Sequence, residues 1–287
     1  GQTLLLENLR FHKGEETNDK NFSENLTFGI DYFVNDAFSC SHRRHSSTVG
    51  VTNFLPSFMG THLEKEIKAL EGVLNNPNKP VAAIIGGSKV STKIDVINFL
   101  LKKMDIIIIG GAMANTFVAA KGLDVGKSLF EKECIDLAKE LIEKSQNNNC
   151  NLILPTDFIV SKNLKKHAEY TTANFDSMPQ NMMALDIGPK SIELINKNIN
   201  NCKTILWNGP LGAFETYPFD KGTNKVASHV SSLTKQKKIL SVAGGGDTVS
   251  ALNNAKVLND FSYVSTAGGA FLEWLEGKVL PGIEPIS

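Results

Sequence analysis

The sequence predicts an α/β protein built on a parallel, doubly wound sheet. From residue 78 onward, short apolar runs end in glycine or another small residue, and each is followed by a segment with helical periodicity. Strands that alternate with helices in this way are typical of a parallel sheet. The run Ile106–Ile109 is apolar throughout, as expected where helices cover both faces of a sheet. The length of 287 residues favours about two domains.

The expected elements of this part follow in order along the chain. An apolar strand in 81–87 leads into a helix that begins near Ser88, and a strand in 105–111 leads into the next helix. The remaining segments are an amphipathic helix at 131–146, a single apolar run at 151–160, a helix at 191–199, a strand and loop at 203–215, a helix at 221–233, a strand and loop at 237–246, and a strand followed by a helix at 261–277.

The first part of the chain has a different organisation. The segments "LLLENLRF" (4–11) and "DYFVNDAF" (31–38) are predicted strands, and 41–48 is a basic loop. Residues 61–74 form a predicted amphipathic helix, whose apolar stripe comprises Leu63, Ile67, Leu70 and Leu74. The segment "NNPNKP" (75–80) then interrupts the chain. We place a domain boundary here, with the helix as a connector and hinge candidate.

Composition limits the classes of partner. Lysine plus arginine (30) equals aspartate plus glutamate (30), and this balance argues against a general nucleic-acid or membrane-surface role. The four cysteines are widely spaced and form no C-x-x-C pair, which excludes the usual zinc spacings and is typical of reduced thiols in a cytosol. No apolar run reaches transmembrane length. We therefore expect a cytoplasmic protein that binds small molecules.

Glycine clusters follow the expected strands at five places. They lie at 86–87, 110–111, 209–212, 244–246 and 268–269. A single cluster could be no more than a tight turn. In a doubly wound sheet, however, the loops after the strands open at one edge, where ligands bind. We therefore expect the clusters to converge around an anionic ligand.

Two lysines follow the first of these clusters. Lys89 and Lys93 are four residues apart in "GGSKVSTKI", and on a helix that begins near Ser88 they would share one face. A helix N-terminus adds free N–H donors and positive dipole. The pair predicts a site for a polyphosphate or a transferring phosphoryl group. The alternative is a pair of solvated surface lysines.

An acid follows the fourth cluster, in "GGGDTVSAL". This motif matches neither a Walker A loop nor the G-x-G-x-x-G fingerprint. Asp247 could be only the N-cap of the next helix. It could instead hold a magnesium ion that bridges phosphate oxygens, so that the acid meets the anion through a cation.

The loop "SHRRHSST" (41–48) carries two arginines and two histidines. His42 and His45 alone would suggest a metal site, but Arg43 and Arg44 beside them disfavour a cation. Guanidinium groups match carboxylate and phosphate oxygens, so the loop predicts a pocket for an acidic, phosphorylated metabolite. A solvated basic loop is the alternative.

Taken together, these motifs resemble the phosphoglycerate kinase family. The match lies in "LLLENLRFHKGEE", "VNDAFSCSHRRHSSTVG", "IIGGSKVSTKI", "IIGGAMANTF", "LDIGP", "LWNGPLGAFE", "VAGGGDTVSAL", "VSTAGGAFLEWLEG" and "KVLPGI", which cover nearly the whole chain in family order. The resemblance implies an α/β fold with two Rossmann-like doubly wound parallel-sheet domains, the first only partly present. It also implies a glycolytic and gluconeogenic kinase, a transferase that moves a phosphoryl group reversibly between 1,3-bisphosphoglycerate and ADP, giving 3-phosphoglycerate and ATP.

The resemblance also implies a division of the chain. Residues 1–60 would be the C-terminal part of the phosphoglycerate-binding domain, and 61–77 the connector helix and hinge. Residues 78–278 would form the nucleotide-binding domain, and 279–287 a tail that returns toward the first domain. The implied cofactor is Mg²⁺, with ADP or ATP as substrate, and the implied assembly is a monomer with neither nucleic acid nor membrane as partner.

Residue by residue, the resemblance implies the following roles. Arg10 and Arg43 would contact the phosphoglycerate, Lys89 would hold the transferring phosphoryl group, and Lys93 the nucleotide phosphates. Lys89, Arg43 and Gly246 would be the catalytic groups. The nucleotide site would comprise Gly87, Lys89, Lys93, Gly111, Leu185, Asn208, Pro210, Glu215, Gly245, Gly246, Asp247 and Thr248, with Glu215 on the ribose and Asp247 on the metal.

The chain departs from the family pattern in several places. Ala112 and Ala267 stand where many relatives have glycine, Ser88 and Thr92 replace a common Ala and Asp, and Arg44 is an extra cation. The family motifs R-V-D-F-N-V-P and S-H-L-G-R-P are absent, so we expect a fragment that binds nucleotide but is itself inactive. Two other readings stay open: a non-catalytic nucleotide-binding module, and an NAD-dependent oxidoreductase, which would need a G-x-G-x-x-G fingerprint.

Overall fold

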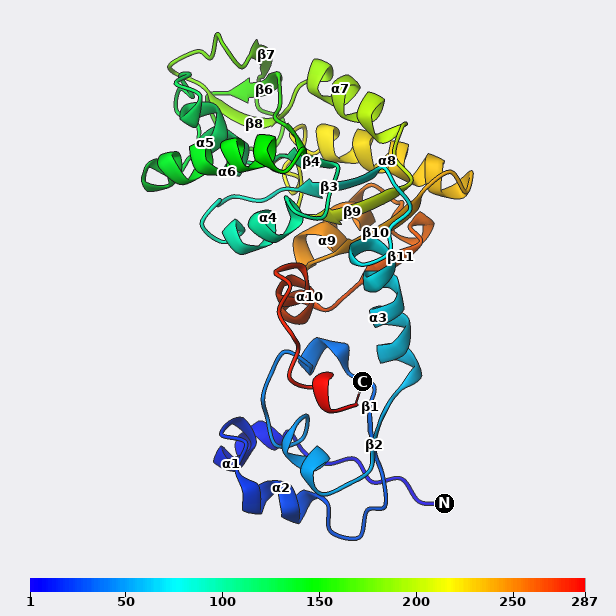
Figure 1. Cartoon of the computed structure of the whole chain (residues 1–287). Coiled ribbons are helices and arrows are strands. Elements are labelled where there is room, and N and C mark those ends of the chain that lie inside the picture. Colours follow the sequence, from blue (N-terminus) through cyan, green and yellow to red (C-terminus); the bar gives the residue numbers. More distant parts are fainter. Residues whose placement is uncertain (287) are drawn as a thin grey trace. The chain divides into compact units, whose positions relative to one another are not determined.

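The computed structural model describes residues 1–286, which divide into two compact units (Figure 1). Unit 1 comprises Gly1–Lys68 together with the segment from Ala267 onward, and unit 2 comprises Ala69–Thr266. Unit 1 is therefore built from both ends of the chain. Each unit is an α/β arrangement with its own parallel sheet, which confirms the predicted fold class.

A six-stranded parallel sheet forms the centre of unit 2. Its strands are β3 (Val81–Ile85), β4 (Ile106–Ile109), β5 (Asn151–Ile153), β9 (Thr204–Asn208), β10 (Leu240–Gly244) and β11 (Tyr263–Ser265). They lie side by side in the order β5-β4-β3-β9-β10-β11. Numbered along the chain, this is the doubly wound order, in which winding reverses between the two central strands. That reversal falls between β3 and β9.

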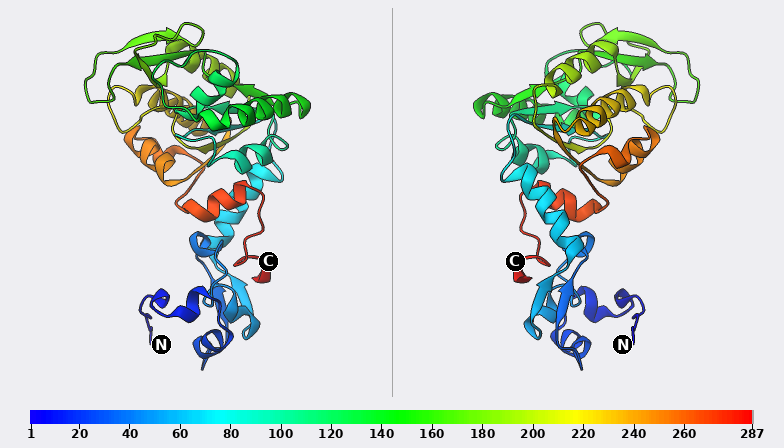
Figure 2. Two further views of the ribbon diagram at one scale, coloured as in Figure 1. Left: turned by 90° about the vertical axis from the view of Figure 1, so that its left-hand side faces the viewer. Right: turned by 90° about the vertical axis from the view of Figure 1, so that its right-hand side faces the viewer.

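Helices lie on both sides of this sheet (Figures 1 and 2). They are α4 (Ile94–Leu100), α5 (Met113–Ala120), α6 (Ile135–Asn147), α7 (Pro189–Ile199), α8 (Lys221–Lys235) and α9 (Gly246–Asn254), with short 3-10 turns η4 (Lys132–Cys134) and η5 (Leu258–Asp260). Every residue of β3 and of β9 is buried. One face of the sheet contributes Ile84, Ile205 and Trp207 to a core cluster that also contains residues of α7, α8 and α9.

A second, antiparallel sheet in unit 2 has the order β7-β6-β8 and was not expected. Its strands are β6 (Asp157–Ser161), β7 (Thr171–Asn174) and β8 (Met183–Ile187). The prediction of one element for the apolar run at 151–160 is therefore wrong, because this run splits into β5 and β6, which belong to different sheets. Pro155 lies in the break, and proline has no N–H to offer a ladder.

Unit 1 contains a two-stranded parallel sheet of β1 (Phe33–Asn35) and β2 (Ser57–Met59). Around it lie η1 (Leu9–Phe11), α1 (Lys13–Glu16), α2 (Lys20–Leu26), η2 (Phe38–Cys40), η3 (Gly50–Asn53), α10 (Gly268–Leu275) and η6 (Glu284–Ile286). The C-terminal segment is bound to the N-terminal one, because Asn35 Nδ2 donates to the Gly282 carbonyl at 2.9 Å. The rings of Phe38 and Trp274 also pack with centroids 6.0 Å apart.

The predicted strand at 4–11 is wrong. Leu4, Leu5 and Leu6 are exposed, and Asn8 caps the short η1 turn instead. A strand needs a neighbour that satisfies its backbone N–H and C=O groups. Among residues 1–286, none of the strands pairs with this segment. Apolar composition alone is therefore no sufficient signal for a strand.

The predicted helix at 61–74 is confirmed as α3 (Thr61–Leu74), and its role as a connector stays a prediction. Its predicted stripe is buried, with Leu63 and Leu70 at 0% exposure. The division between the compact units falls inside this helix, after Lys68, and α10 packs within unit 1. Residues 61–68 and 267–278 thus belong to unit 1 and residues 69–77 to unit 2, which differs from the expected division of the chain. The functional assignment of these ranges stays a prediction. Within residues 1–286, no helix combines the length and apolar character needed to cross a bilayer.

We expect Leu252→Ala to destabilise unit 2 strongly. Leu252 is 0% exposed and belongs to the core cluster, and such a truncation costs about 2–5 kcal/mol of the free energy of unfolding. Leu164→Ala, at a position that is 52% exposed, is the matched control and should cost less than about 1 kcal/mol. Urea denaturation measures both. Equal losses would contradict the packing described here.

Candidate functional site

The glycine loops meet where the winding of the sheet reverses. The Gly86 N–H donates to the Asn208 carbonyl at 2.9 Å, and the Gly111 N–H donates to the Leu211 carbonyl at 2.9 Å. A side chain at Gly86 would overlap the carbonyl oxygen of Pro210. All five glycine clusters follow strands of this one sheet, since the cluster at 268–269 comes after β11. The fifth, at 268–269, belongs to unit 1.

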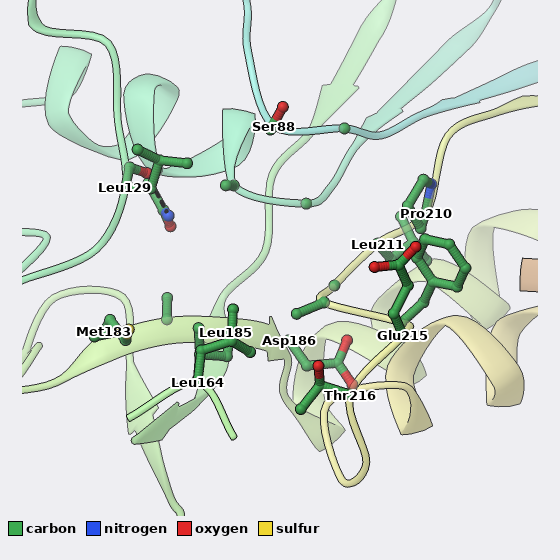
Figure 3. Close-up of a pocket in the computed structure, with 18 of the residues that line it drawn as sticks. Ser88, Leu129, Leu164, Met183, Leu185, Asp186, Pro210, Leu211, Glu215 and Thr216 are labelled. Carbon is green, nitrogen blue, oxygen red and sulfur yellow. Dashed lines mark hydrogen bonds between the residues drawn. The ribbon is translucent and has the colours of Figure 1, made fainter. Parts of the chain in front are cut away.

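These loops border a cavity of about 390 Å³ (Figure 3). Six of the predicted nucleotide-binding residues line it: Gly87, Gly111, Leu185, Pro210, Glu215 and Asp247. Much of the wall is apolar and comes from Leu129, Phe158, Leu164, Met183, Leu211 and Phe214. Ala112 lines it too. A concave, mainly apolar site of this size with a few polar groups is typical of small-molecule pockets.

A second group of predicted residues forms a hydrogen-bonded cluster beside the cavity. Lys93 Nζ donates to Asn208 Oδ1, and Asn208 Nδ2 donates to the Gly244 carbonyl at 2.8 Å. The Gly209 N–H donates to Thr248 Oγ1 at 2.7 Å. Asn208 and Thr248 are both buried. The cluster joins the loops after β9 and β10 to the segment that carries Lys93.

The start of α9 settles one alternative for Asp247. The N-cap residue is Gly245, at φ +96°, a left-handed conformation that favours glycine. Gly246 is the first helical residue and Asp247 the second. Asp247 is therefore not the N-cap. Its exposed side chain lies at the rim of the cavity, in the first turn of the helix.

The predicted helix start near Ser88 is wrong, because α4 begins only at Ile94. Residues 89–93 form a turn, in which Thr92 Oγ1 donates to the Lys89 carbonyl at 3.0 Å and the Lys93 N–H donates to the Val90 carbonyl at 2.8 Å. Side chains of this type compete with helical hydrogen bonds. Lys89 and Lys93 thus lie in a loop and at the N-cap position, and they do not share a helix face.

Glu131 fixes this loop from a neighbouring segment. Its carboxylate accepts the Ser91 N–H at 3.0 Å and the Ser91 hydroxyl at 2.5 Å. Its own N–H donates to Thr116 Oγ1, on α5, at 3.1 Å. Partial burial raises the pKa of the Glu131 carboxyl, but the hydrogen bonds from Ser91 lower this pKa by more, so that the net shift is downward. The ionised form of Glu131 is thus the one that binds the loop.

Asp186 is a buried acid in the cavity wall. It is 3% exposed, and its two oxygens accept the N–H groups of Gly222 at 2.6 Å and Ile187 at 2.9 Å. Burial raises the pKa of this carboxyl to about 8 despite these hydrogen bonds. Side chains at Gly212 or Gly222 would overlap it. Asp186 therefore joins β8, the loop after β9 and the start of α8.

The predicted phosphoglycerate contacts lie in unit 1. Arg10 and Arg43 are both exposed. The basic loop at 41–48 is bound by the buried Glu15, which accepts the Ser47 N–H at 3.0 Å and the Ser47 hydroxyl at 2.6 Å. His45 Nδ1 lies 3.6 Å from the same carboxylate. The loop therefore has a defined conformation that leaves Arg43 and Arg44 open to solvent.

Sequence reasoning missed three residues of the site. Asp186 stands next to the predicted Leu185 in "LDIGP", and Glu131 precedes α6. Asn115 is a buried amide in the otherwise mainly apolar α5. A polar residue inside an apolar helical segment was the available signal for Asn115. No local pattern pointed to the contacts of Glu131 with Ser91 or of Asp186 with Gly222, since these partners are distant in the sequence.

We expect the stability of unit 2 to decrease as pH rises from about 4 to about 8, because the folded protein binds the Asp186 proton more tightly than the unfolded chain. Below about pH 4 Asp186 is protonated in both the folded and the unfolded state, and above about pH 8 its contribution to stability is fully lost. Asp186→Asn should flatten the dependence of the free energy of unfolding on pH across this range. Asp136→Asn, at an exposed position on α6, should keep the unmodified slope. Equal slopes for all three proteins would contradict the assignment.

Comparisons with known proteins agree with this architecture. The family model for phosphoglycerate kinase matches residues 1–278. A phosphoglycerate kinase of Rhizobium meliloti is 52% identical over 284 residues, which are 99% of this chain and 71% of the relative. One from Brucella melitensis is 54% identical over 284 residues, covering 99% of this chain and 72% of the relative.

Solved structures give the same result. The phosphoglycerate kinase from Coxiella burnetii has a TM-score of 0.92 and 43% identity, covering 97% of this chain and 71% of that one. The enzyme from Pyrococcus horikoshii OT3 has a TM-score of 0.81 and 28% identity over the same shares. A family match over most of the residues, together with relatives above 50% identity, decides the assignment. The chain belongs to the phosphoglycerate kinase family.

Proposed function

We propose that unit 2 binds ADP or ATP and that the chain serves reversible phosphoryl transfer between 1,3-bisphosphoglycerate and ADP. The observation that carries the proposal is that six of the predicted nucleotide-binding residues line the same cavity. It opens where the winding of the sheet reverses, which is where doubly wound sheets bind their ligands. The family assignment supplies the reaction class.

The cavity suits a nucleoside. Its apolar wall, with Gly87, Gly111, Leu185 and Pro210 at the lining, would take the adenine base. Glu215 lies at the opposite side from Leu129 and would bind the ribose (Figure 3). The phosphates would then extend toward the start of α9, where Gly245 and Gly246 offer backbone N–H groups. Asn208 and Thr248 support that end of the site.

Asp247 is the residue that would hold Mg²⁺. Among residues 1–286, no cluster of three or more His, Cys, Asp or Glu side chains could bind a metal alone. Mg²⁺ is usually bound by one or two carboxylates plus substrate phosphates, and a single exposed carboxylate at the cavity rim fits that pattern. When bound, the ion would neutralise charge on the phosphate oxygens.

The cations and backbone donors would carry the transfer itself. In the reaction, the phosphoryl group leaves the carboxyl oxygen of the acyl phosphate and bonds to the terminal oxygen of ADP. Such a transfer needs placement and charge stabilisation more than covalent chemistry. Lys89 would hold the moving group, Lys93 the nucleotide phosphates, and Gly246 would donate its N–H. Arg10 and Arg43 would bind the phosphoglycerate.

Cytoplasmic location, a monomeric state and little turnover by this chain stay predictions. The neutral charge balance supports an absence of nucleic-acid and membrane partners. A coupled assay of this chain tests the expected inactivity, and normal turnover would contradict it. Sedimentation tests the monomer.

We expect this chain to bind Mg-ADP at submillimolar to millimolar concentration, measured by calorimetry. Asp247→Asn should raise the Kd for Mg-ADP by about tenfold or more, since a charge-assisted contact is lost, and should leave binding of metal-free ADP nearly unchanged. Asp136→Asn is the exposed-acid control. NADH should not bind. Absence of Mg-ADP binding at millimolar concentration would refute the proposed function.

Glu131 and Ser91 should act on nucleotide binding as one unit. Glu131→Ala removes both hydrogen bonds that fix the loop with Lys89 and Lys93, whereas Ser91→Ala removes only the one from the hydroxyl. Each should raise the Kd for Mg-ADP by about three- to tenfold, the value of one or two hydrogen bonds. The double variant should match the Glu131→Ala variant, because Glu131→Ala already removes the hydrogen bond that Ser91→Ala would remove. Additive losses would contradict this coupling.

A further inference from the structure

Asn115 is a buried amide in the wall of the nucleotide cavity. It lies on α5, is 2% exposed, and is one of the lining residues. Met113, Ala114, Phe117 and Val118 around it are buried and apolar. A polar group in such surroundings is costly unless it is hydrogen bonded. The hydrogen-bonding state of its two polar atoms therefore matters.

The nitrogen and the oxygen of the Asn115 amide differ in their hydrogen bonding. Nδ2 donates to the Leu129 carbonyl at 2.9 Å. Because a carbonyl oxygen can only accept, this contact fixes the orientation of the amide and turns Oδ1 away from Leu129. Within the described part of the chain, Oδ1 accepts no hydrogen bond. It is also not one of the enclosed, unpaired atoms, so it opens onto the cavity as an unused acceptor.

The hydrogen bond to Leu129 indicates where Asn115 lies along the cavity. Leu129 and Met183 lie at one side of the hollow, whereas Pro210 and Glu215 lie at the other (Figure 3). Asn115 is bonded to Leu129 and thus belongs to the side away from Glu215. Asp186, another polar residue of the lining, already accepts two backbone N–H groups. The Asn115 acceptor therefore belongs to the side of the cavity opposite the proposed ribose contact.

We propose that Asn115 Oδ1 accepts a hydrogen bond from the exocyclic 6-amino group of adenine and makes this site prefer 6-aminopurines to 6-oxopurines. The inference rests on the proposed function, which puts the base in this cavity and the ribose at Glu215. A 6-oxo group would set one acceptor against another and leave Oδ1 unpaired. Sites built to bond a polar group reject analogues that lack it.

The first test needs no variant. Calorimetry in the presence of Mg²⁺ compares ADP, purine riboside 5′-diphosphate (which lacks the 6-amino group) and inosine 5′-diphosphate on the unmodified chain. ADP should bind about tenfold more tightly than purine riboside diphosphate, as expected for one buried hydrogen bond. Inosine diphosphate should bind no better than purine riboside diphosphate, because its 6-oxo group faces the Oδ1 acceptor.

Variants assign the preference to the residue. Asn115→Ala should bring the three affinities to within about twofold of one another, chiefly by weakening ADP. Leu129→Ala is the matched control, because it removes an apolar contact at the same side of the cavity but keeps the Leu129 carbonyl and the amide. It should weaken all three ligands by a similar factor and preserve their ratio. Thermal unfolding checks that both variants fold. If Asn115→Ala does not fold, the comparison of the three ligands on the unmodified chain decides the proposal.

The outcomes separate this inference from the proposed function. Failure of every nucleoside diphosphate to bind at millimolar concentration overturns both. Equal binding of ADP and inosine diphosphate to the unmodified chain overturns only the role of Asn115. So does a loss in Asn115→Ala that is the same for all three ligands.

Discussion

The site depends on how closely two backbone loops approach each other between β3 and β9. The Gly86 N–H is bound to the Asn208 carbonyl at 2.9 Å, and neither Gly86 nor Gly209 has room for a side chain. The chain leaves these neighbouring strands toward opposite faces of the sheet, so a hollow opens between the departing segments. The loops that carry Gly87, Asn208 and Pro210 are positioned by this contact.

The parts of the fold that repeat a local rule could be predicted from the sequence. Apolar strands such as β4, ending in glycine, predicted the parallel sheet and the meeting of the loops that contain Gly111 and Pro210. That these two residues line a nucleotide site was implied by the family resemblance. The start of α4 could not be predicted, because the hydrogen bonds between Glu131 and Ser91 are distant in sequence and compete with helical ones. The antiparallel sheet was missed for a similar reason, since β6 looks like a continuation of β5 until its partners are known.

The two compact units fix their cationic loops by the same chemistry. In unit 1 Glu15 binds both the N–H and the hydroxyl of Ser47, and in unit 2 Glu131 binds both groups of Ser91. In each case the acid bonds to a serine beside the cations. These hydrogen bonds order the loop. Such preorganised positive groups are what a phosphorylated ligand requires.

The pairing of the two chain ends within unit 1 has a consequence for biosynthesis. A ribosome releases residues in order, and domains tend to fold as they emerge. Unit 2 is one continuous segment, so all its strands are available before synthesis ends. Unit 1 lacks the contacts of Gly282 and Trp274 until then. The residues of unit 1 that precede unit 2 in the sequence therefore gain these contacts only after unit 2 has been translated.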